Sequence, residues 1–253
     1  MARNLTDIYV GVNKADEKRN KNDLYPTPPL ATYSLIKTLG HNMPEQILEP
    51  CAGRGHIAAE LRRHGYDVTA TDLHKYEDLV SEVISGHDAT IMQPMSPNDV
   101  GVITNPPYHK DLPRVLTEKW LNEEYRFIAM FVRLTFLEGK KRKKLFTKYP
   151  PSDIIFLSDR VNFGPVGLLP TEPIEKKDQI GGMIAYIWWV HCKQTLNENN
   201  GNTKLHWVSL EELYPEWRQK YDESINTSNQ PTYKENGSVY QQQVYNNILR
   251  YCE

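Results

Sequence analysis

Short apolar runs alternate with helix-like stretches along most of this chain, and that alternation constrains the fold more than any other feature of the sequence. The runs have the length and the β-branched or aromatic content of strands. Strands that alternate with helices form βαβ units, in which helices cover both faces of a mostly parallel sheet. The sequence therefore predicts an α/β fold with strands at residues 46–49, 67–71, 101–104, 127–132, 154–157 and 183–191.

Several of the predicted helices have recognisable ends. Thr27 can cap a helix that has Pro28 at its first position and Gly40 after its last turn. Ser209-Leu-Glu-Glu212 has the pattern of a capping box and predicts a short helix toward Tyr221. The remaining helical patterns cover residues 57–64, 111–124 and 138–148.

The chain of 253 residues is long enough for one buried domain and short for two. We expect a flexible polar leader at 1–23, an α/β domain at 24–193, and a polar C-terminal extension with a short helix at 194–253. Residues 160–182 are rich in Pro and Gly and predict a long loop, which usually means a binding loop or disorder. The tail at 222–247 is interpreted as weakly ordered or as a segment that contacts substrate.

Composition excludes several classes of protein. The polar leader does not resemble a secretory signal, and the longest apolar runs are too short to cross a bilayer. The three cysteines are odd in number and widely spaced, which argues against a disulfide framework or a metal site and indicates a reducing cytoplasm. The net charge of −2 means that binding to nucleic acid would need a local basic patch.

A glycine turn connects the first predicted strand to a helix. In Ile47-Leu-Glu-Pro-Cys-Ala-Gly-Arg-Gly55, the glycines allow a tight turn and a close approach of ligand, and the helix directs free amide groups at the turn. Asp72 ends the second strand about twenty residues later, where nucleotide-binding α/β folds hold ribose hydroxyls. The glycines could serve packing alone and the acid could cap a helix, but the pair favours a nucleotide-like ligand.

A rigid corner follows the strand at 101–104. In Asn105-Pro-Pro-Tyr108 the two prolines fix φ and remove two donors, so that the backbone carbonyls point outward. The alternative is a stiff strand-to-helix turn with an exposed tyrosine. Because this corner follows the glycine turn in a βαβ series, a functional site is the favoured interpretation.

The glycine turn, Asp72, Asp88 and the Asn-Pro-Pro-Tyr corner together resemble the amino methyltransferases that use S-adenosylmethionine (AdoMet), particularly the DNA adenine-N6 enzymes of bacteria and phages. The resemblance covers residues 24–190. It implies a Rossmann-like class I methyltransferase fold with a mostly parallel seven-stranded sheet and helices on both faces. The domain at 24–193 would then be the methyltransferase domain.

The resemblance also implies how AdoMet is bound. The glycine turn cradles its methionine end, Asp72 binds its ribose, and Asp88 contacts its adenine amine, although Asp88 could equally be a turn residue. Tyr25-Pro-Thr-Pro28 covers its carboxylate, which agrees with a capped helix N-terminus as an anion site. The implied cofactor residues are Tyr25, Pro26, Thr27, Glu49, Pro50, Cys51, Ala52, Gly53, Gly55, Asp72, Leu73, Asp88 and Asn105.

The predicted catalytic residues are Asn105, Pro106, Pro107 and Tyr108. An aromatic amine is a weak nucleophile, and the Asn105 side-chain oxygen and the Pro106 carbonyl can accept its two N–H bonds. Such bonds strengthen as positive charge builds on nitrogen, and they hold the reacting atoms in line without a general base. Tyr108 would stack on a base rotated out of the duplex, a contact worth about 1–3 kcal/mol.

The acceptor is less constrained. Within the family, Asn at the first position of this motif accompanies adenine, whereas Ser is usual for cytosine. Relatives that methylate ribosomal RNA or release-factor glutamine typically carry a substantial domain before the cofactor turn, and here 46 residues precede Ile47. DNA is therefore the expected partner, with RNA or protein glutamine as the alternative. A binding module without turnover also stays open.

One basic segment is a candidate for phosphate contacts. Residues 139–148 hold six basic side chains and no acid, and such contacts make binding fall steeply with salt. A solvated helix face is the alternative. The expected nucleic-acid residues are Lys140, Lys141, Arg142, Lys143 and Lys144. No separate target-recognition domain is evident, so either the segment after Gln194 or a partner would supply specificity, or specificity is low.

Overall fold

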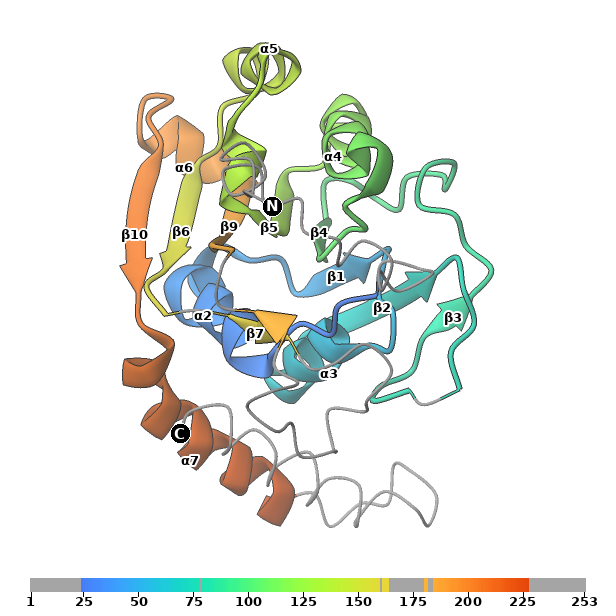
Figure 1. Ribbon diagram of the computed structural model, residues 1–253, viewed down its shortest axis with the longest axis vertical. Coiled ribbons are helices and arrows are strands. Elements are labelled where there is room, and N and C mark those ends of the chain that lie inside the picture. Colours follow the sequence, from blue (N-terminus) through green and yellow to red (C-terminus); the bar gives the residue numbers. More distant parts are fainter. Residues whose placement is uncertain (1–23, 78, 160, 164–179, 182–183, 228–253) are drawn as a thin grey trace, which may run out of the picture.

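The computed structural model describes residues 24–77, 79–159, 161–163, 180–181 and 184–227. Its centre is an eight-stranded sheet in the order β10-β6-β9-β5-β4-β1-β2-β3 (Figure 1). Within this sheet only β9 is antiparallel to its neighbours, β5 and β6. The strands are β1 (Gln46–Glu49), β2 (Asp67–Asp72), β3 (Ile84–Ser85), β4 (Val100–Thr104), β5 (Phe127–Arg133), β6 (Asp153–Leu157), β9 (Tyr186–Cys192) and β10 (Lys204–Val208).

Helices cover both faces of the sheet. One apolar cluster joins α2, α3 and α7 to one face, and a second joins α4 and α5 to the other. Figure 1 shows α4 and α5 at the top of the view, with α2, α3 and α7 below them. The helices are α2 (Pro29–Leu39), η2 (Gly40–Asn42), α3 (His56–Arg63), η3 (His109–Asp111), α4 (Leu112–Asn122), η4 (Leu134–Leu137), α5 (Lys140–Lys148), α6 (Lys193–Glu198) and α7 (Leu210–Thr227).

The observed architecture confirms the expected Rossmann-like α/β class, with eight strands in place of seven. The central strands β5 and β9 are buried along almost their whole length, as expected for strands covered on both faces. Within the described residues, no helix has the length and apolar character needed to cross a membrane.

The predicted cap of the first helix is wrong. The α2 helix begins at Pro29, its N-cap is Pro28, and no side chain caps it. The Thr27 hydroxyl instead accepts a hydrogen bond from the side-chain amide of Asn105. The predicted end of the helix is confirmed, since Gly40 is the C-cap of α2; its φ of −52° is right-handed, and the chain continues directly into η2.

The C-terminal half contains structure that the sequence did not predict. The polar stretch after Cys192 forms α6 and then β10, which pairs in parallel with β6. The Ser209 half of the predicted capping box is confirmed, since the Glu212 backbone N–H donates to Ser209 Oγ over 3.2 Å. The helix that follows continues past the predicted end at Tyr221 to Thr227.

The long loop expected at 160–182 includes a two-stranded antiparallel pair, β7 (Asn162–Phe163) and β8 (Ile180–Gly181). Residues 164–179 of that loop, the leader at 1–23 and the tail from 228 onward lie outside the described residues. Residues 194–227, expected as an extension of the domain, contribute a strand to its sheet and a helix to its surface.

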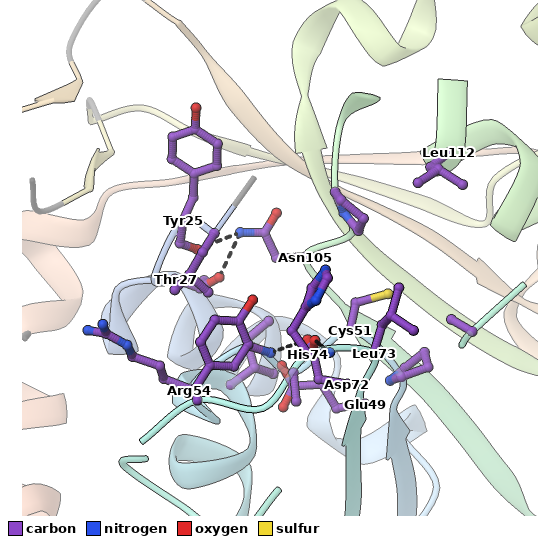
Figure 2. A pocket seen from close by; sticks show the side chains of 18 of the residues that line it. Tyr25, Thr27, Glu49, Cys51, Arg54, Asp72, Leu73, His74, Asn105 and Leu112 are labelled. Atoms are coloured by element: carbon purple, nitrogen blue, oxygen red, sulfur yellow. Dashed lines mark hydrogen bonds between the residues drawn. The ribbon is translucent and has the colours of Figure 1, made fainter. Parts of the chain in front are cut away.

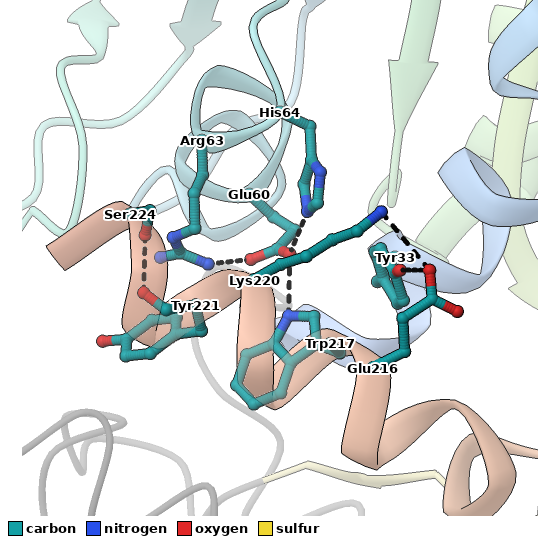
Figure 3. Close-up of polar contacts among 9 residues, drawn as sticks. All are labelled: Tyr33, Glu60, Arg63, His64, Glu216, Trp217, Lys220, Tyr221 and Ser224. Atoms are coloured by element: carbon teal, nitrogen blue, oxygen red, sulfur yellow. Dashed lines mark hydrogen bonds and ion pairs between the residues drawn. The ribbon is translucent and has the colours of Figure 1, made fainter. Parts of the chain in front are cut away.

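A polar cluster fastens α7 to α3 (Figure 3). At its centre is Glu60 on α3, whose side chain is 1% exposed. The carboxylate accepts a hydrogen bond from Trp217 Nε1 over 2.8 Å, forms an ion pair with Arg63, and lies 3.1 Å from His64 Nε2. We call Glu60, Arg63, His64 and Trp217 the Glu60 cluster. Because Trp217 is itself buried, apolar and polar contacts together fix α7 against the domain.

Candidate active site

A cavity of about 460 Å³ opens at the carboxyl ends of β1, β2 and β4 (Figure 2), a size typical of small-ligand sites. Gly55, Pro106 and Tyr108 are not among the described residues that line it. All the other predicted cofactor and catalytic residues line the cavity: Tyr25, Pro26, Thr27, Glu49, Pro50, Cys51, Ala52, Gly53, Asp72, Leu73, Asp88, Asn105 and Pro107. The glycine turn and the Asn-Pro-Pro-Tyr corner therefore face one common space.

The glycine turn requires both of its glycines. Gly53 and Gly55 have φ values of +55° and +85°, in the left-handed region that favours glycine. A Cβ on Gly53 would lie 2.5 Å from Leu24 Cδ1, and a Cβ on Gly55 would lie 3.1 Å from Ser81. The turn can therefore pack closely against Leu24 on one side and Ser81 on the other only without side chains at these positions.

Glu49 is a buried carboxylate at the edge of this cavity. It is 1% exposed, and its Oε2 accepts a hydrogen bond from the Ala58 backbone N–H over 2.8 Å, at the first turn of α3. Burial raises the pKa of Glu49 well above its usual value, and the Ala58 N–H opposes that shift. In the described part of the chain Ala58 is its single hydrogen-bond donor, so the carboxylate keeps acceptor capacity for a cationic or hydrogen-bonding ligand.

Asp72 connects the end of β2 to the glycine turn. Its Oδ2 accepts from the Gly53 backbone N–H and its Oδ1 from the His74 backbone N–H, each over 2.8 Å. These two bonds fix the carboxylate and leave one lone pair on each oxygen for further donors. Leu73 beside it is 52% exposed and lines the same cavity, which gives a planar ring an apolar surface.

Asp88 lines the cavity and also forms a turn. Its Oδ1 accepts from the backbone N–H and the hydroxyl of Thr90, over 2.8 Å and 2.7 Å. These bonds lower the pKa of Asp88. The two interpretations that the sequence left open for this residue are thus compatible, since the turn presents the carboxylate at the cavity.

The side chain of Asn105 is held on both sides. Its Nδ2 donates to the Tyr25 backbone carbonyl over 3.2 Å and to Thr27 Oγ1 over 3.0 Å (Figure 2). Its Oδ1 accepts from the Tyr108 hydroxyl over 2.6 Å, and that hydroxyl lies 3.1 Å from the Phe131 carbonyl oxygen. Rotation of the amide would break these bonds, so the orientation of the Asn105 oxygen is fixed by its neighbours.

Tyr108 lies beside the cavity in a cluster of aromatic rings. Its ring centroid is 6.4 Å from that of Tyr25 and 6.3 Å from that of Tyr186. The Arg133 guanidinium lies over the Tyr108 ring, 4.9 Å from its centroid. The stacking of Tyr108 on an acceptor base stays a prediction.

The cavity includes residues that sequence reasoning did not select. Most of them are close in sequence to the motifs already identified, and that proximity was the one signal from which they could have been predicted. Burial lowers the pKa of His56, directly after Gly55, to about 3, so this imidazole is neutral at pH 7. The additional lining residues are Leu24, Arg54, His56, Ile57, His74, Tyr76, His87, Ala89, Thr90, His109, Leu112 and Leu116.

The predicted nucleic-acid residues lie on α5, away from the lining of the cavity. The helix packs through Leu145, which is buried, and the lysines at 140, 141, 143 and 144 are exposed. Arg142 bends back over the ring of Phe136, at 5.7 Å from its centroid. The exposed lysines are available for phosphate contacts, which stay a prediction.

No protein-family model matches this chain, and no curated protein matches it. Among solved structures it resembles a candidate RNA methyltransferase from Pyrococcus horikoshii, with 15% identity and a TM-score of 0.44 over 67% of this chain and 86% of that one. It also resembles the methyltransferase subunit of a type I restriction-modification system from Streptococcus thermophilus, with 12% identity and a TM-score of 0.46 over 77% of this chain. This chain spans 52% of that subunit.

A third similar structure is the 1,6-didemethyltoxoflavin-N1-methyltransferase of Burkholderia thailandensis with bound S-adenosylhomocysteine. It has 14% identity and a TM-score of 0.39, over 73% of this chain and 84% of that one. Because the TM-scores stay below 0.5, the assignment of an activity depends on the geometry of the site itself.

Proposed function

We propose that this chain transfers a methyl group from AdoMet to an exocyclic amino nitrogen, with N6 of adenine in DNA as the acceptor. One observation carries the proposal: the fixed side chain of Asn105 and the glycine turn with Glu49 and Asp72 line the same cavity. Methyl transfer requires that an amine acceptor site and a nucleoside-like site adjoin, and one cavity of this size can hold both.

The cofactor half of the cavity fits AdoMet chemically. When bound, AdoMet supplies an electrophilic methyl group on a positively charged sulfur. Glu49 is buried with a single donor, and its remaining acceptor capacity suits a cationic ligand. Asp72 offers a fixed carboxylate to ribose hydroxyls, and Leu73 offers an apolar surface to adenine.

The acceptor half would act through hydrogen-bond acceptors. Tyr108 occupies one lone pair of Asn105 Oδ1, which leaves the second for an N–H of the amine. The backbone carbonyl of Pro106 is the second acceptor in the proposal. These bonds strengthen as nitrogen becomes positive, and the hydrogen bonds to Tyr25 and Thr27 keep Asn105 from reorienting during the reaction.

The choice of adenine in DNA rests on two features. It depends on the Asn at the first position of the resembled motif and on the exposed lysines of α5. RNA bases and protein glutamine carry similar amines, so a direct test must offer all of these acceptors together.

The test is methyl transfer from labelled AdoMet to duplex DNA, single-stranded DNA, RNA and release factor in parallel, followed by digestion of the labelled product. We expect N6-methyladenine in DNA. Replacement of Asn105 by Ala should lower kcat by about 100- to 1,000-fold, because it removes an acceptor that acts mainly in the transition state.

Asn122→Ala is a matched control. Asn122 also accepts a hydrogen bond from a tyrosine hydroxyl, that of Tyr149 over 3.0 Å, but it lies on the surface at the end of α4. Its replacement should leave kcat unchanged. Label in RNA or protein would correct the acceptor, whereas no AdoMet binding and no transfer to any acceptor would refute the proposed function.

A further inference from the structure

Arg133 stands at the edge of the sheet where the proposed acceptor would bind. It is the last residue of β5, and it pairs with Tyr186 at the start of β9. Strand β5 is parallel to β4, with Thr104 opposite Met130, so the two strands end at the same edge of the sheet. The corner that begins at Asn105 therefore lies one strand away from Arg133.

The surroundings of Arg133 are aromatic. The guanidinium lies over the ring of Tyr108, whose hydroxyl is bonded to Asn105. Burial disfavours the positive charge, yet the neighbouring Tyr186, Tyr108 and Tyr25 raise the pKa of Arg133 above its ordinary value. Contacts of this kind hold the cation in place beside the acceptor corner.

Arg133 has no carboxylate partner among the described residues, and its buried Nε has no hydrogen-bond acceptor there. Two other partly buried arginines do have carboxylate partners. Arg63 pairs with Glu60, and Arg114 binds Asp111 and Glu118. A partly buried guanidinium whose Nε–H lacks an acceptor is costly unless another group completes its hydrogen bonds, and its planar fork suits the two oxygens of a phosphate or carboxylate.

We propose that Arg133 binds a backbone phosphate next to the nucleotide whose amine lies at Asn105, and thereby selects a nucleic acid over a protein amide as acceptor. This inference rests on the proposed methyl transfer. A phosphodiester accompanies every base of a polynucleotide, whereas a glutamine side chain brings no anion of its own.

The chain that follows Arg133 extends the same positive character. It passes through η4 directly into α5, where four exposed lysines begin within the first two turns. A nucleic-acid strand whose nucleotide lies at the corner can thus contact the partly buried Arg133 at the site and the exposed lysines of α5 beyond it. Phosphate contacts fix the register of a nucleic acid, while the pocket reads the base.

The test is a methylphosphonate scan, which replaces one charged phosphate at a time by a neutral group in the shortest DNA that the protein methylates. With the natural protein, we expect kcat/KM to fall about 10- to 100-fold at one phosphate that flanks the target adenine, the range for a hydrogen bond to a charged group. Arg133→Gln should show a similar loss on unmodified DNA and no further loss at that phosphate. The fall should appear mainly in KM.

Two further variants keep this test decisive. Arg133→Lys retains the charge and should remain sensitive at the same phosphate, even if Arg133→Gln folds poorly. Arg126→Gln is the matched control, since Arg126 is exposed just before the amino end of the same strand, at the opposite edge of the sheet. It should behave like the natural protein at every position.

The outcomes separate the two proposals. If DNA is methylated and Arg133→Gln keeps the full phosphate profile of the natural protein, the phosphate contact is refuted and methyl transfer stands. Exclusive methylation of a protein amide also refutes the contact. Failure of AdoMet to bind refutes the proposed function and this inference with it.

Discussion

Two buried glutamates lie on either side of the first turn of α3, and the chain uses them in opposite ways. Glu49, before the glycine turn, and Glu60, inside the helix, are each 1% exposed. Glu60 is saturated by Arg63, His64 and Trp217 (Figure 3), whereas Glu49 receives one backbone N–H and faces a cavity. A buried carboxylate with several hydrogen-bond and ion-pair partners stabilises the fold. A buried carboxylate with a single donor can still accept hydrogen bonds from a ligand.

The largest expected effect comes from the removal of Glu60, which tests whether this carboxylate stabilises the fold. Glu60→Ala should lower the free energy of unfolding by about 3–5 kcal/mol, because it leaves buried donors of Arg63 and Trp217 without an acceptor. Urea unfolding measures the loss, and calorimetry at a temperature where the variant is folded should show AdoMet affinity unchanged.

The matched control is Glu216→Ala on α7. Glu216 binds Tyr33 and Lys37, but its side chain is 39% exposed. Its removal should cost about 1 kcal/mol or less, as for surface ion pairs. An equal loss of unfolding free energy in the two variants would show that the buried partners of Glu60 do not add to its contribution to stability.

The next effect concerns Glu49. Glu49→Gln keeps a carbonyl oxygen for the Ala58 N–H, so at about pH 5, below the raised pKa of Glu49, the free energy of unfolding should change by about 1 kcal/mol or less. The loss of negative charge should weaken AdoMet binding by about 10- to 100-fold, which calorimetry can measure. Glu45→Gln, at an exposed position just before β1, should leave the affinity unchanged. A variant that lost stability but bound AdoMet normally would place Glu49 in the same class as Glu60.

The last effect is a pH dependence that distinguishes the two carboxylates. Burial raises the folded-state pKa of Glu49, so the native protein holds this proton more tightly than the unfolded chain does. The contribution of Glu49 to stability is therefore complete below its ordinary pKa of 4.5 and is lost as the pH rises through the raised value.

Denaturant unfolding of the ligand-free protein from about pH 5 to about pH 8 measures the contribution of Glu49 to the free energy of unfolding. That contribution can fall by about 1.4 kcal/mol per pH unit. The difference in unfolding free energy between the natural protein and Glu49→Gln should decrease with rising pH. Parallel curves would contradict the assignment of a raised pKa to Glu49.

The sequence predicted what depends on local pattern. Strands β4 and β5 are largely apolar runs, and the gathering of Glu49, Asp72 and Asn105 at one edge follows from the parallel order of the strands that carry them. Strand β10 was missed because Lys204–Val208 is short and mixed in polarity, and its extended state depends on pairing with β6.

Long-range contacts account for the other differences. Thr27 has the right residue type to cap α2, but Asn105, 78 residues later, donates a hydrogen bond to its hydroxyl. The position of Arg133 over the ring of Tyr108 likewise depends on the pairing of strands and has no local signal. Local propensity cannot decide between two partners when one of them is supplied by the tertiary fold.

The hydrogen bonds from Asn105 to Tyr25 and Thr27 join a wall of the cofactor cavity to the acceptor corner. A ligand that shifts either side must therefore alter the other. Thermodynamic reciprocity then requires that any tightening of acceptor binding by the cofactor equals the tightening of cofactor binding by the acceptor. In a methyl-transfer cycle, a favourable coupling of this kind would loosen the hold on the second product once the first departs.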